Sequence, residues 1–121
     1  MKNVSIFGYD DYVLNVIKII SQYSNVKYLI YPKNRRDRLS KLIIDYTKKN
    51  DIDLLELPFL KDKKEMSVLI KKLLKINFDL FLSYSFSQII PKEIYTMPKL
   101  GTINLHGGEL PRYRGSHVLN W

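Results

Sequence analysis

The chain has 121 residues, of which 45% are hydrophobic and 26% are charged, and its formal net charge is +8. This length supports one domain with one core, and the hydrophobic fraction argues against disorder of the whole chain. The sequence contains no cysteine, which excludes disulfides and thiolate catalysis, and no membrane span or signal peptide is apparent, so we expect a soluble cytoplasmic protein.

The first half of the chain alternates between predicted strands and helices. Residues 4–7 are apolar and rich in β-forming side chains, which predicts a short buried strand. Asp10 or Asp11 is expected to cap the helix that follows, because a carboxylate there accepts hydrogen bonds from free backbone N–H groups. Residues 26–31 predict the second strand. The strand is expected to stop at the proline that follows.

The second half continues this alternation after a basic segment, residues 33–38. The apolar spacing predicts in turn a helix over 39–50, a strand over 54–57, a helix over 66–74, and strands over 78–84 and 101–106. Such alternation is typical of an α/β, Rossmann-like fold, a parallel sheet with helices on both faces. In these folds ligands bind beyond the carboxyl ends of the strands.

The turn after the first strand is unlike a nucleotide-binding loop. Residues 7–11 contain one glycine, the bulky Tyr9 and two carboxylates. A dinucleotide site needs several glycines so that the backbone can approach the pyrophosphate, and carboxylates would repel it. The turn therefore argues against NAD binding and against a P-loop.

Asn104 and His106 lie two residues apart in the last predicted strand. The period of two in a strand would place both side chains on one face, at its carboxyl end. An amide donor aimed at a carbonyl oxygen, beside a base aimed at an amine, suits acyl transfer to an amine. Taken alone this spacing is weak evidence, because a buried histidine with satisfied hydrogen bonds is the commoner outcome.

The surrounding residues form two linked motifs. Residues 101–115, followed by Leu119-Asn120-Trp121, closely resemble the signature of the folate-dependent formyltransferases. Residues 85–94 resemble the loop that holds the pterin of 10-formyltetrahydrofolate in that family. The resemblance implies that residues 1–121 are the N-terminal portion of a formyltransferase catalytic domain, with a sheet that is incomplete at the C-terminus.

The resemblance also implies roles for individual residues, with 10-formyltetrahydrofolate as co-substrate. Asn104 would polarise the formyl oxygen and stabilise the oxyanion, and His106 would be the general base on the acceptor amine. The folate pocket would be lined by one loop, comprising Phe86, Ser87, Gln88, Ile89 and Ile90. For Ile89 and Ile90, packing in the core fits the sequence equally well.

Three residues of the motif over residues 101–115 are candidates for substrate binding. Gly108 permits a tight turn and a close approach to a ligand. Arg112 and Arg114 suit a phosphate or carboxylate, although anchoring of the loop backbone explains them as well. We expect no metal site.

The acceptor amine differs among members of this family. Enzymes that act on methionyl-tRNA carry a Gly- and Arg-rich insertion after the second strand and usually a Ser-Leu-Leu-Pro run. Residues 32–38 lack the glycines and residues 108–111 read Gly-Glu-Leu-Pro, so the sequence favours a nucleotide-linked amino sugar as the acceptor. A methionyl-tRNA formyltransferase fragment is the alternative, with tRNA as the partner.

A non-catalytic role stays open as well. The family's catalytic Asp, which orients the histidine, would come later in the chain than Trp121. We therefore expect this polypeptide alone to have little transferase activity. It would otherwise serve as a folate-binding or dimerisation module, and a homodimer is a possible assembly.

Overall fold

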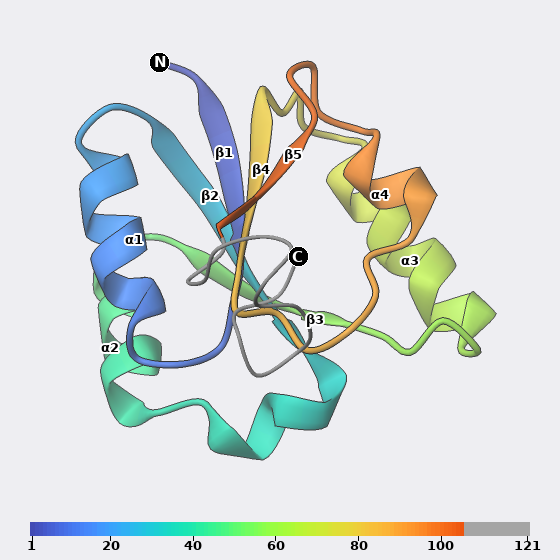
Figure 1. Ribbon diagram of the computed structural model, residues 1–121, viewed down its shortest axis with the longest axis horizontal. Coiled ribbons are helices and arrows are strands. Elements are labelled where there is room, and N and C mark those ends of the chain that lie inside the picture. Colours follow the sequence, from blue (N-terminus) through green and yellow to red (C-terminus); the bar gives the residue numbers. More distant parts are fainter. Residues whose placement is uncertain (106–121) are drawn as a thin grey trace, which may run out of the picture.

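The described part of the computed structural model comprises residues 1–105, except for the side chains of residues 36–38. Its centre is a five-stranded parallel sheet with strand order β3-β2-β1-β4-β5 (Figure 1). The strands are β1 Asn3–Phe7, β2 Asn25–Pro32, β3 Asp53–Leu57, β4 Leu80–Tyr84 and β5 Thr102–Leu105. The predicted α/β, Rossmann-like fold is confirmed.

Two helical layers cover the sheet. The helices are α1 Val13–Ser21, α2 Lys41–Lys49, α3 Lys63–Leu73 and α4 Lys92–Tyr95, and the 3-10 helix η1 covers Lys33–Arg38. Helices α1 and α2 lie on one face, and α3 and α4 lie on the other (Figure 1). None of the helices within residues 1–105 is long and apolar enough to cross a membrane.

The strand order indicates where ligands would bind. From β1 the chain moves outward through β2 and β3, and it then returns to the other side of β1 to form β4 and β5. The crossover loops therefore separate between β1 and β4. In an open parallel sheet this switch point opens a crevice at the carboxyl ends of the strands, where ligands bind.

The two faces of the sheet have different cores. The core beneath α1 and α2 is aliphatic, with Ile6, Ile17 and Ile43 fully buried. The core beneath α3 and α4 is aromatic, with the rings of Phe7 and Phe81 in edge contact at 5.3 Å between centroids. The period of two in each strand separates these side chains, as the sequence predicts.

Some element boundaries differ from those expected. The fourth strand begins at Leu80 rather than at residue 78, and the ring of Phe78 ahead of it packs in the aromatic core. The N-cap residue of α1 is Tyr12, which makes no side-chain cap hydrogen bond. The Asp10 carboxylate instead accepts a hydrogen bond from the Tyr12 N–H at 3.1 Å, ahead of the helix. Neither Asp10 nor Asp11 is therefore the N-cap residue, but the Asp10 carboxylate does accept a backbone N–H at the start of the helix.

Candidate functional site

Loops after β1, β2 and β4 meet at the carboxyl edge of the sheet. Gly8 allows the loop after β1 to pack closely at this edge. Its N–H donates to the carbonyl of Ile30 at 3.0 Å, and a Cβ at this position would lie 2.6 Å from Val13 Cγ2. Only glycine allows α1 to start this close to β1. The lone glycine of the first turn therefore has a packing role, consistent with the absence of a phosphate motif.

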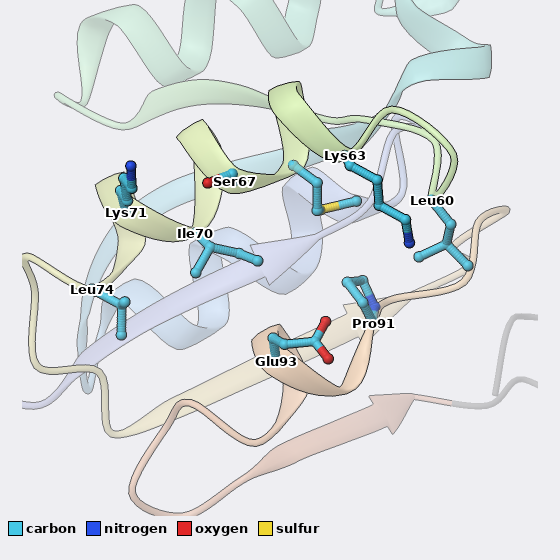
Figure 2. Close-up of a pocket in the computed structure, with 9 residues that line it drawn as sticks. Leu60, Lys63, Ser67, Ile70, Lys71, Leu74, Pro91 and Glu93 are labelled. Carbon is cyan, nitrogen blue, oxygen red and sulfur yellow. The ribbon is translucent and has the colours of Figure 1, made fainter.

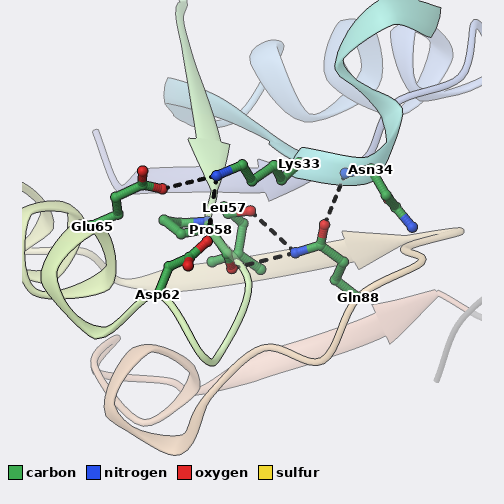
Figure 3. A network of polar contacts seen from close by, with 7 residues as sticks. All are labelled: Lys33, Asn34, Leu57, Pro58, Asp62, Glu65 and Gln88. Carbon is green, nitrogen blue, oxygen red and sulfur yellow. Dashed lines mark hydrogen bonds and ion pairs between the residues drawn. The ribbon is translucent and has the colours of Figure 1, made fainter.

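The Gln88 side chain ties the loop after β4 to two other loops (Figure 3). Its Nε2 donates to the carbonyl oxygens of Leu57 at 3.1 Å and Pro58 at 3.4 Å. Its Oε1 accepts from the backbone N–H of Asn34 at 3.1 Å. Ser87 adds a fourth bond, donating from Oγ to Asn34 Oδ1 at 3.0 Å. The loop after β4 is thus held against the ends of β2 and β3.

An ion pair reinforces the neighbouring segments. Lys33 Nζ lies 3.1 Å from Glu65 Oε2 and 3.4 Å from Asp62 Oδ2 (Figure 3). The hydrogen bond to Glu65, followed by that to Asp62, raises the pKa of the Lys33 ammonium. The pairs lie at the surface, so they orient η1 toward the start of α3 more than they stabilise the fold.

The backbone of the loop after β4 is bent sharply at its first residue. Ser85 has a φ of +51°, in the left-handed region. This turn directs Phe86 back into the aromatic core, where its ring is fully buried and lies 5.5 Å from the Phe7 ring. The Phe86 side chain therefore anchors the loop, and its contact with a ligand would be through the backbone.

The remaining loop residues expected to line the folate pocket divide into two kinds. The Ser87 and Gln88 side chains are engaged in the hydrogen bonds described above. Ile90 packs against the aromatic core. Ile89, in contrast, has 72% of its surface exposed. Ile89 is therefore the apolar side chain of this loop that is open to a ligand.

Asn104 lies at the carboxyl end of β5, opposite Ser83 in the parallel β4–β5 register. Its side chain is exposed and on the same face as Ser83 and Phe81, the face covered by α3 and α4. His106, Gly108, Arg112 and Arg114 lie outside the described residues. Among residues 1–105, no group of three His, Asp or Glu side chains is placed to hold a metal ion.

Burial and charge favour protonated groups next to the first turn. Burial raises the pKa of the Asp10 carboxyl, although backbone hydrogen bonds from Tyr12 and Val13 oppose this shift. Burial also raises the pKa of the Tyr84 phenol, and the charge of Asp10 adds to that effect. Of the two carboxylates in this turn, that of Asp10 is thus partly desolvated.

A groove of about 400 Å³ lies elsewhere, between α3 and the start of α4 (Figure 2). Apolar side chains and a few charged ones line it together, among them Ile70, Lys71, Pro91 and Glu93. None of the described residues expected to bind folate or to act on it lines this groove. The carboxyl edge of the sheet therefore remains the candidate site.

Sequence reasoning missed Asn34 and the ends of β3 as parts of this site. Asn34 belongs to a basic segment, in which the charged residues are the prominent feature and a single amide carries no signal of its own. The carbonyl oxygens of Leu57 and Pro58 are backbone groups that carry no sequence signal. Only the three-dimensional meeting of the loops reveals these contacts.

Known proteins resemble the chain in sequence and in fold. A family model described as formyl transferase matches residues 14–121. A methionyl-tRNA formyltransferase from Clostridium botulinum is 39% identical over 108 residues, covering 86% of this chain and 34% of the relative. One from Clostridium beijerinckii is 32% identical over 124 residues, covering 98% of this chain and 39% of the relative. The chain thus spans between a third and two fifths of these relatives.

A solved structure shares the fold. The glycinamide ribonucleotide transformylase 1 from Symbiobacterium toebii superposes with a TM-score of 0.66 and covers 95% of this chain and 56% of its own. The sequence identity is 15%, so the likeness concerns the fold alone.

The Gln88 contacts generate a stability prediction. We expect Gln88→Ala to lower the free energy of unfolding by about 1 kcal/mol, because the partly buried carbonyls of Leu57 and Pro58 lose their donor. Gln88→Glu should be destabilising too, since a carboxylate cannot donate to the carbonyls of Leu57 and Pro58. Urea denaturation measures both, with Gln22→Ala at the exposed end of α1 as the control. Equal stability of all three variants would contradict the bridging role.

The raised pKa of Asp10 generates a pH prediction. A carboxyl with a higher pKa in the folded state binds its proton more tightly there, so its contribution to stability falls as the pH rises. Asp10→Asn keeps the acceptor for Tyr12 without the charge, and we expect a higher melting temperature than wild type at neutral pH. The difference should vanish below about pH 3.9, the ordinary aspartate value. Asp51→Asn is the exposed control, and a pH-independent effect of Asp10→Asn would oppose this account.

Proposed function

The chain belongs to the formyltransferase family, and on that premise we propose that it forms the N-terminal part of a methionyl-tRNA formyltransferase. The enzyme would transfer a formyl group from 10-formyltetrahydrofolate to the amino group of methionyl-tRNA. The observation that carries the reaction type is the exposed amide of Asn104 at the carboxyl end of β5, on the same edge of the sheet as the end of β4 from which the Gln88 loop starts.

The proposed reaction uses this edge in a defined order. The amine nitrogen attacks the formyl carbon, and the carbonyl oxygen becomes an oxyanion that accepts a hydrogen bond from Asn104 Nδ2. His106 takes the proton that the amine loses. The bond from the formyl carbon to N10 then breaks, and N10 of tetrahydrofolate takes up a proton. The products are formylmethionyl-tRNA and tetrahydrofolate.

The folate would lie against the loop after β4. Hydrogen bonds from Gln88 and Ser87 fix this loop, and the exposed Ile89 provides an apolar contact for the pterin. A loop that is already fixed loses less conformational entropy when the folate binds. Phe86 supports the loop from within the core.

Methionyl-tRNA is preferred here to the nucleotide-linked amino sugar that the loop motifs favoured. Both relatives described above are named for methionyl-tRNA, and no observation points specifically to a sugar. One cation near the site supports this acceptor as well. The Arg35 guanidinium stacks on the Tyr9 ring, 5.0 Å from its centroid, and pairs with no carboxylate within the described part of the chain. With a net charge of +8, such groups suit RNA phosphates.

A transfer assay on the protein made from its complete reading frame tests both the proposed acceptor and the proposed role of Asn104. We expect formylation of methionyl-tRNA and none of nucleotide-linked amino sugars, with a rate that falls steeply between low and moderate salt. Asn104→Ala should lower kcat about 100-fold or more, the usual effect of losing an oxyanion donor.

Asn15→Ala, an exposed asparagine of α1, is the matched control and should keep full activity. Formylation of the sugar but not of the tRNA would overturn the acceptor. Full activity of Asn104→Ala would overturn the mechanism.

A further inference from the structure

Ser83 is a buried hydroxyl at the carboxyl end of β4. Its exposed fraction is 0%, and its Oγ has no hydrogen-bond partner within residues 1–105. The preceding positions of the strand hold the apolar Phe81 and Leu82. A buried hydroxyl without a partner costs folding free energy that an alanine would not. The position therefore calls for a partner.

The sheet register identifies the groups beside this hydroxyl. Ser83 lies opposite Phe7 on β1 and opposite Asn104 on β5. Residues paired in this way point to the same face, and adjacent strands are about 4.8 Å apart. Rotation of the two short side chains about χ1 can bring the hydroxyl and the amide to about 2.9 Å. Of the two neighbours, only Asn104 has polar side-chain atoms.

We propose that Ser83 is a positioning residue, whose hydroxyl donates a hydrogen bond to Asn104 Oδ1. The bond turns the Nδ2 hydrogens toward the place where the formyl oxygen lies. This inference rests on the function proposed above, in which Asn104 stabilises the oxyanion.

The physical advantage is twofold. An exposed amide samples several rotamers, and a bond to Oδ1 selects one of them. Donation to Oδ1 also polarises the amide, which makes its N–H groups better donors. Both effects act on the transition state, where the oxyanion develops, more than on the bound substrate.

The chain contains a matched control for this inference. Ser5 on β1 is also fully buried, lacks a partner within the described residues and faces the same side of the sheet. Its register partners are Tyr28 and Phe81, so it has no asparagine beside it. Ser5→Ala and Ser83→Ala remove the same atom from similar surroundings.

The first measurement follows the Asn104 side-chain amide by NMR, with 15N-asparagine in the complete protein. The signal is identified as the one lost in Asn104→Asp. We expect Ser83→Ala to shift this signal, and Ser5→Ala and Ser83→Thr to leave it in place. An unchanged signal in Ser83→Ala would overturn the proposal. This readout does not require activity, so it decides on Ser83 even if the proposed function fails.

The second measurement is steady-state kinetics. We expect Ser83→Ala to lower kcat about three- to tenfold, the worth of one hydrogen bond, with the KM for the folate unchanged. Ser83→Thr should retain most of the wild-type kcat, and Ser5→Ala all of it. Equal losses in both alanine variants, or a loss confined to KM, would mean that Ser83 is merely structural. Ser83→Cys, which keeps the volume but donates weakly, replaces Ser83→Ala if that variant does not fold.

Discussion

One side-chain amide, that of Gln88, holds together the edge of the sheet on which the proposed chemistry depends. Loops at the ends of parallel strands carry backbone groups without ladder partners, and these need other donors and acceptors. Gln88 supplies both, to Asn34 on one side and to the carbonyls of Leu57 and Pro58 on the other. Its loop is therefore held against the ends of β2 and β3. Without this tie, the anchors left to the loop after β4 would be the buried Phe86 ring, the packing of Ile90 and the hydrogen bond from Ser87 to Asn34.

The strand β5 then provides the second requirement of the proposed reaction, a fixed position for the Asn104 amide. Asn104 sits on a strand paired to β4 over its full described length, and its position is set by the ladder of hydrogen bonds. In the proposed function, the loop held by Gln88 and the Asn104 amide on β5 form a pre-organised pair, which the acceptor amine would approach from outside. The choice of acceptor would then depend on surface groups near this edge, such as the Arg35 guanidinium of η1.

Much of this fold could be predicted because burial and periodicity act locally. The strands of the sheet and the stripes of α2 and α3 follow directly from the apolar spacing. The Gln88 bridge could not be predicted, because it joins residues that are 30 or more positions apart through backbone carbonyls. Asp10 illustrates the same limit, since its role follows from the geometry of the turn rather than from its residue type. The acceptor stays a proposal, because two short loop motifs favour a nucleotide-linked amino sugar whereas the relatives described above are named for methionyl-tRNA.

A crystal structure of the complete protein with 5-formyltetrahydrofolate, a stable analogue of the formyl donor, tests the central claim most directly. The account predicts the pterin against residues 86–90 with the Gln88 hydrogen bonds intact. It also predicts the Asn104 amide directed at the formyl end of the ligand. A pterin bound in the groove between α3 and α4, or an Asn104 amide turned away from the ligand, would contradict the account.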